Sequence, residues 1–171
     1  MPFTPFHFGP GLFAKSLLPR HFSWLAFIAS QVLIDCETLF YLVQRTYPVH
    51  RFFHTLLGGA VAGAVTGVAL VGLTRHRATR ARLRLHLFDR AGPSVKSETA
   101  TVAILVGALV GGLSHSLLDG LMHPDVRPFA PWGDTNPLLG SIGPGTLHLG
   151  CLLLGLVGAV VMFVHVRREG A

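Results

Sequence analysis

Charged side chains are scarce in this sequence. Only 13% of its 171 residues are Asp, Glu, Lys or Arg, whereas soluble domains carry about 25%. Half of the residues are hydrophobic, and the mean hydropathy is +0.54. This composition argues against a soluble globular protein and favours an integral membrane protein. At this length we expect a single domain over residues 1–171.

Disulfide pairs and a cleavable signal are also missing. The two cysteines, Cys36 and Cys151, lie inside apolar runs, so a disulfide framework is not expected. The N-terminus has no charged segment before a short apolar core and no small-residue cleavage site. We therefore expect the first apolar run to remain in the mature protein.

Long apolar runs are what the sequence does contain. A spanning helix needs about 20 apolar residues, and four stretches meet this length: about 22–43, 53–73, 99–118 and 146–166. We see no strand pattern and no internal repeat. The sequence therefore predicts an all-α integral membrane bundle of four transmembrane helices, preceded by a short N-terminal leader.

The leader is rich in proline. Pro2, Pro5 and Pro10 are expected to prevent a regular helix at its start. Residues 12–18 are predicted to form a short interfacial helix or part of a re-entrant segment.

Basic residues are distributed unevenly between the loops. Seven of the 14 lie in the segment 75–97, and four more flank the first and last spans on the same side. Only Arg45, Arg51 and Arg127 lie on the other side. By the positive-inside rule, the basic loop and both termini should be cytoplasmic. The loop suits anionic lipid headgroups, and we expect the bilayer rather than nucleic acid as its partner.

Acidic and imidazole side chains are set into or beside the spans, where ionisable groups are costly. They are Asp35, Glu37, His50, His54, His115, Asp119, His123, Asp125 and His148. Under the predicted topology all of them fall toward the extracytoplasmic half, so separate spans bring them to a similar depth. A bound metal ion would account for their presence.

The third span carries the most informative spacing. Gly107, Gly111, His115, Asp119 and His123 follow one another at intervals of four, so they share one helical face. The glycines allow close helix contact, as do Gly59, Gly63 and Gly67 in the second span.

The ligand types narrow the choice of metal. His115 and Asp119 lie one turn apart and can bind one ion together. Nitrogen and carboxylate ligands without thiolates suit zinc, with manganese or iron as alternatives. The alternative for His115 and Asp119 is a structural pair. Asp35 could instead pair with a histidine or with Arg51, and Arg51 could bind a substrate phosphate or carboxylate.

Four motifs give the chain a family resemblance. They are a leader with His7-x-Gly9, residues 33–37 (Leu-Ile-Asp-Cys-Glu), residues 50–55 (His-Arg-Phe-Phe-His-Thr), and residues 113–119 (Leu-Ser-His-Ser-Leu-Leu-Asp) followed by Pro128 and Pro131-Trp132. With these motifs the chain resembles the YdjM-like family of inner-membrane proteins, which are expected to be metal-dependent hydrolases. The resemblance implies the cytoplasmic (inner) membrane of a bacterium or archaeon.

The chain departs from the family pattern at three points. Ile34 replaces a proline and Glu37 replaces an aspartate, while His50 and His54 are four residues apart rather than five. The spacing leaves open which of these two histidines binds a metal directly.

A more distant resemblance links the family to zinc-dependent phospholipase C and the fungal zinc nucleases, which are all-helical and use several zinc ions. This resemblance implies that Asp35, His54, His115 and Asp119 surround one ion, and that Asp119 and His7 approach a second. The positive-inside count places His7 on the opposite side from the other ligands. Either the leader dips into the membrane, the site lies deep in the bundle, or His7 is not a ligand.

The resulting hypothesis is a hydrolase that uses one or two divalent ions on a phosphoester or ester in a lipid or other small amphipathic substrate. Glu37 or His50 would assist proton transfer, and Arg51 and His123 would bind the substrate. Two alternatives are a metal-binding transporter and a non-catalytic assembly protein whose polar residues only hold helices together.

Overall fold

The computed structural model describes residues 5–76 and 97–169, and this part of the chain contains helices and no strands. The elements are η1 (Pro5–His7), α1 (Phe8–Leu17), α2 (Trp24–Val43), η2 (Phe52–His54), α3 (Leu56–Arg75), η4 (Ser97–Thr99), α6 (Thr101–Met122) and α7 (Pro144–Glu169). Helices α2, α3, α6 and α7 are long and apolar enough to cross a membrane. The predicted all-α fold with four spans is therefore confirmed. The basic loop predicted over 75–97 lies almost entirely outside the described residues.

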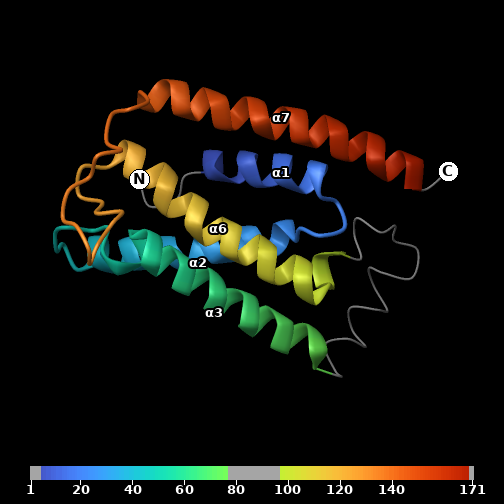
Figure 1. Cartoon of the computed structure of the whole chain (residues 1–171), viewed down its shortest axis with the longest axis horizontal. Coiled ribbons are helices and arrows are strands. Elements are labelled where there is room, and N and C mark those ends of the chain that lie inside the picture. The colour runs from blue at the N-terminus through green and yellow to red at the C-terminus, as the bar shows by residue number, and fades with distance from the viewer. Residues whose placement is uncertain (1–4, 77–96, 170–171) are drawn as a thin grey trace.

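Helix α6 packs against both α2 and α3, and these three helices form the core of the bundle. Helix α1 packs mainly against α7, which runs along one flank of the molecule (Figure 1). The connections after α2 and α6 meet at one end of the bundle, where η1 also lies (Figure 1). That end carries the candidate site, and we refer to it below as the site end.

The opposite end is held by one partly buried carboxylate. Glu98 accepts hydrogen bonds from the hydroxyl of Ser23 at 2.8 Å and from the amide of Leu25 at 3.0 Å. It also forms an ion pair with Lys15 at 2.9 Å. Because the first amides of a helix lack intrahelical partners, a carboxylate there stabilises the start of α2. Glu98 thereby joins α1, α2 and the start of α6.

Among the helix boundaries that differ from the prediction, two bear on the candidate site. Helix α1 begins at Phe8 and includes Pro10; the proline lies in the first turn, where its missing amide would have no partner. Helix α6 continues past residue 118 to Met122, and the side chain of Asn136 donates to the carbonyl oxygen of Gly120 at 2.8 Å. The extra turn places Asp119 inside the helix.

The predicted glycine positions lie at the contacts between core helices. A methyl group at Gly59 of α3 would lie 2.5 Å from the carbonyl oxygen of Gly112 in α6, and one at Gly111 would lie 2.5 Å from that of Phe27 in α2. Real side-chain atoms do not approach a backbone oxygen so closely, so both contacts require glycine. Small residues at these positions bring the helix backbones together.

The outward surfaces of the spans are apolar. Large hydrophobic side chains are exposed along all four helices, among them Leu39, Val68, Leu109 and Phe163. A soluble monomer rarely exposes so much contiguous apolar surface, whereas a surface that faces lipid requires it.

A matched pair of substitutions tests the α3–α6 contact. We expect Gly59→Ala to destabilise the protein by about 1–3 kcal/mol, because the new methyl group forces the two backbones apart. Gly72→Ala, in the same helix, meets no atom within 4 Å and should be neutral or slightly stabilising. Thermal unfolding of the purified protein in detergent measures both. Equal melting temperatures for the two variants would contradict the close contact.

Candidate metal centre

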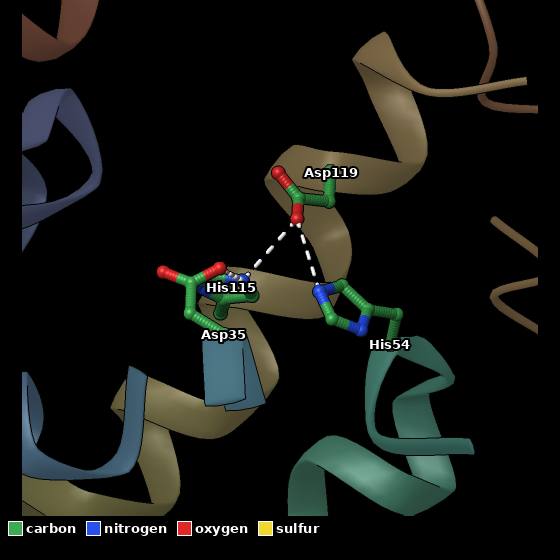
Figure 2. Close-up of side chains that lie close together, drawn as sticks. All are labelled: Asp35, His54, His115 and Asp119. Atoms are coloured by element: carbon green, nitrogen blue, oxygen red, sulfur yellow. Dashed lines mark ion pairs between the residues drawn. The ribbon is translucent and has the colours of Figure 1, made fainter. Parts of the chain in front are cut away.

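Four buried side chains from three elements converge at the site end. Asp35 comes from α2, His54 from η2, and His115 and Asp119 from α6 (Figure 2). Each offers one ligand atom, and these four atoms all lie within 4.8 Å of one another. Residues distant in the sequence thus form a cluster that could hold a metal ion.

Asp119 lies at the centre of the cluster. Its Oδ2 is 3.2 Å from Nε2 of His115 and 3.4 Å from Nε2 of His54. Nε2 of His115 is also 3.4 Å from Oδ1 of Asp35. Among the described residues, the ion-pair partner of Asp35 is therefore His115 and not Arg51.

Several buried atoms of the cluster have no hydrogen-bond partner in the described part of the chain. They are both ring nitrogens of His115, both ring nitrogens of His7, and Oδ1 of Asp119. The contacts of His115 with Asp35 and Asp119 are close but lack hydrogen-bond geometry. Buried polar groups are nearly always paired, and leaving them unpaired is costly. A cation would satisfy these atoms, so the residues present fit a metal ion.

Two contacts set the position of His54, one between α6 and η2 and one at the start of α3. The hydroxyl of Ser116 donates to the carbonyl oxygen of Phe53 at 3.2 Å. Thr55 caps α3 by accepting from the amide of Gly58 at 2.8 Å. The residue before this helix is thereby fixed, and the histidine that precedes it faces Asp119.

Glu37 orients His54. Its Oε2 is 3.2 Å from Nδ1 of His54 and accepts hydrogen bonds from the amides of Arg51 at 3.3 Å and Phe53 at 3.0 Å. With Nδ1 directed at this carboxylate, Nε2 faces Asp119. A carboxylate behind a metal-binding histidine is a common arrangement, because it fixes the ring and its tautomer. The catalytic role predicted for Glu37 stays a prediction.

His7 of the leader reaches the same cluster. Its Nε2 is 3.6 Å from Oδ1 of Asp119, and its ring meets that of His115 edge-on with centroids 5.1 Å apart. The structure thus brings His7 of the leader to the same end of the bundle as the other predicted ligands. Each oxygen of Asp119 faces different imidazoles, since Oδ1 is also 3.8 Å from Nε2 of His123.

Burial keeps His7 and His54, which lie outside the four spans, in the neutral form. It lowers the pKa of His7 to about 4 and also lowers the pKa of His54, although contact with Glu37 acts in the opposite direction. Desolvation disfavours the charged imidazolium. A neutral imidazole is the form that binds a metal, so both rings are ready to act as ligands.

A second group, formed by His50, His123 and Asp125, lies beside the first. Nδ1 of His50 is 2.8 Å from Oδ1 of Asp125, and its ring stacks on that of His123 with centroids 4.5 Å apart. Burial alone would raise the pKa of Asp125, but hydrogen bonds from the side chain and amide of His50 lower it below its ordinary value. Asp125 thus remains a carboxylate that orients His50.

The structure places the two histidines of the segment 50–55 in different groups. His54 lies within the central cluster, whereas His50 lies next to it, with ring centroids 4.6 Å apart. The spacing in the sequence had left this choice open.

Arg51 lies outside the cluster. Its guanidinium carbon is 3.7 Å from the centre of the Tyr41 ring, and its Nε donates to the carbonyl oxygen of Pro48 at 3.0 Å. Together with His50 and Asp125 it lines a cavity of about 580 Å³. The predicted substrate-binding role of Arg51 is compatible with this position.

For three residues near the cluster, no role had been predicted from the sequence. The hydroxyl of Thr38 lies 3.2 Å from Nε2 of His54, and its position three residues after Asp35 on the same helical face was an available signal. Asp125, two residues after His123, was a visible charge without an assigned partner. The capping role of Asn136 depends on a loop contact that has no local pattern.

Removal of the central carboxylate tests the metal site. We expect Asp119→Asn to lose its bound divalent ion, because Asp119 faces every imidazole of the cluster. Asp134→Asn is a suitable control, since the side chain of Asp134 is 84% exposed. Elemental analysis of detergent-purified protein measures the outcome. Full metal content in the Asp119 variant would refute the site.

Substitution of the carboxylate behind His54 should have a smaller effect. Glu37→Gln is expected to weaken metal affinity about 10–100-fold, the usual range for a residue that orients a ligand. Titration with a competing chelator measures the affinity. An affinity equal to that of the unaltered protein would show that Glu37 does not orient His54.

Comparison with known proteins gives no relative on which to draw. No family model matches the chain, and no curated protein or solved structure is similar to it.

Proposed function

We propose that this protein is a membrane-embedded, metal-dependent hydrolase that cleaves a phosphoester or ester bond in a lipid or other amphipathic substrate. One observation carries the proposal: buried imidazoles and a carboxylate oxygen converge without hydrogen-bond partners in the described part of the chain. The cluster lies at an end of an apolar bundle, beside a cavity of about 580 Å³. The motif resemblance to the YdjM-like family supports the same function.

The central cluster would hold the ion. Asp35, His54, His115 and Asp119 offer two nitrogen and two oxygen ligands, which suits zinc, and manganese or iron are alternatives. His7 and Oδ1 of Asp119 would complete the site or bind a second ion. A bound ion supplies Lewis-acid catalysis and makes water a stronger nucleophile near neutral pH.

His50 would act as the general base and then as the general acid, with Asp125 as its partner. As the oxygen of the attacking water bonds to phosphorus or to the carbonyl carbon, its proton passes to Nε2 of His50, and the same nitrogen returns it to the departing oxygen as the ester bond breaks. Asp125, held at 2.8 Å from Nδ1, stabilises the charged ring meanwhile. Such a pair is typical of general acid–base sites.

The continuity of the helices around the cluster favours hydrolysis over transport. Intramembrane acids and histidines also line ion pathways, but transporter sites typically lie near the bilayer midplane at broken helices. In this protein both α2 and α6 are continuous helices, and the cluster extends from Asp35 near the middle of α2 to Asp119 in the last turn of α6. An amphipathic substrate at the membrane surface can reach such a position.

Activity measurements on vesicles test the proposal. We expect the protein to cleave either a phospholipid or a chromogenic ester, to lose activity with a chelator, and to regain it with zinc, manganese or iron. His115→Ala should reduce turnover about 1000-fold, since several kcal/mol of transition-state stabilisation depend on the ion. Asp134→Asn should retain activity.

The same preparation separates the alternatives. Metal-dependent ion flux across proteoliposomes without turnover of any ester would favour a transporter. Purified protein that contains no divalent metal would favour an assembly protein, and the hydrolase proposal would then be abandoned.

A further inference from the structure

The cavity beside the cluster has a composition that points to a particular ligand. It lies between the segment 48–57 and the segment 125–131 at the site end. Its volume of about 580 Å³ falls within the range of about 300–1,000 Å³ that is usual for small-molecule sites. We propose that this cavity binds the phosphate headgroup of an anionic phospholipid, with Arg51 and Arg127 as its cationic ligands.

Two guanidinium groups line the cavity. Arg51 is held by the Tyr41 ring and by the carbonyl oxygen of Pro48, and its terminal nitrogens have no hydrogen bond or ion pair with residues 5–76 or 97–169. Arg127 pairs with Asp134 at 3.1 Å, but the two side chains are 60% and 84% exposed. An exposed pair of this kind contributes little, so Arg127 can turn to a phosphate, which guanidinium groups bind with two hydrogen bonds.

The acidic group in the cavity wall does not cancel these charges. Asp125 is turned toward the protein interior, where it accepts hydrogen bonds from the amides of Val49 and His50 at 3.2 and 3.3 Å and contacts the His50 ring. The side of the cavity that carries Arg51 and Arg127 is therefore positively charged. An anion fits it better than a cation or a neutral headgroup.

Apart from Thr55, whose hydroxyl donates to the carbonyl oxygen of Phe52, the rest of the lining is apolar. It comprises Pro48, Phe52, Leu57, Ala130 and Pro131. Phe52 and Leu57 are partly exposed, and Leu57 lies in the first turn of α3, one of the helices long enough to cross a membrane. The cavity thus offers a charged region and an apolar one beside a spanning helix. A free phosphate ion would use only the first, whereas a lipid with acyl chains would use both.

The cavity adjoins the candidate metal centre through one side chain. His50 lines the cavity, and its ring lies against those of His54 and His123. The ring of His50 thus lies between the cavity that it lines and His54 of the central cluster. As an assignment of substrate class the inference depends on the proposed hydrolase function, but binding of the lipid does not require turnover.

Binding of phosphatidylglycerol to the full-length protein in detergent provides the test. Native mass spectrometry reports both the bound lipid and any cleaved product by mass. We expect Arg127→Gln and Arg51→Gln each to weaken binding about tenfold, because each removes a charge-assisted contact. Arg168→Gln, an exposed arginine at the far end of α7, should leave binding unchanged. Asp134→Asn should retain or tighten binding, since it frees Arg127.

Three results would overturn the inference. Equal lipid binding by the Arg51/Arg127 double variant and the unaltered protein would show that the two arginines do not bind the headgroup. Diacylglycerol binding as tightly as phosphatidylglycerol would reduce the cavity to an apolar groove. Inorganic phosphate competing with equal affinity would assign the cavity to a free anion. Correct folding of each variant is checked by its elution in size-exclusion chromatography and by its metal content.

These outcomes are distinguishable from failure of the proposed function. Protein that binds the lipid through both arginines but contains no metal would keep this inference as a binding site and refute the hydrolase. Protein that contains metal and cleaves another ester, but does not bind the lipid, would support the hydrolase and refute the lipid-binding site.

Discussion

Burial of ionisable side chains in an apolar bundle is the constraint on which the rest of this structure depends. Asp119, His115 and His54 are almost completely removed from solvent, and such groups are expensive to bury without partners. The molecule brings them close to one another instead of separating them. A common binding partner is needed to offset the cost of burying these groups together. A cation is the simplest such partner for two imidazoles and the carboxylates of Asp35 and Asp119.

Close backbone contacts make this convergence possible. Gly59 and Gly112 allow α3 and α6 to touch, and Gly111 brings α6 against α2, so that ligands on separate helices come within a few ångströms. Longer side chains at these positions would move the helices apart and separate the side chains of the cluster. The connections at the site end add further support, because the amide of Leu56 donates to the carbonyl oxygen of Pro128 at 2.8 Å.

Much of this arrangement follows from local rules. Apolar run length defined the four spans, since a helix must satisfy its own backbone to cross a bilayer. Spacing by four placed His115 and Asp119 on one face with Gly107 and Gly111. The fold class and the proximity of His115 to Asp119 on α6 were therefore predictable before any coordinates, because each depends on residues within one helix.

What the tertiary structure alone decided involves contacts between distant segments. Nothing in the spacing of residues 50–55 distinguishes His54 from His50; the hydrogen bond from Ser116 to Phe53 and the carboxylate of Glu37 make that choice. The place of His7 likewise depends on how α1 packs against α7. The sequence by itself determined which helices form and which faces are polar. Only the packing of those helices decided which polar side chains share a site, because it sets distances between residues that no local periodicity relates.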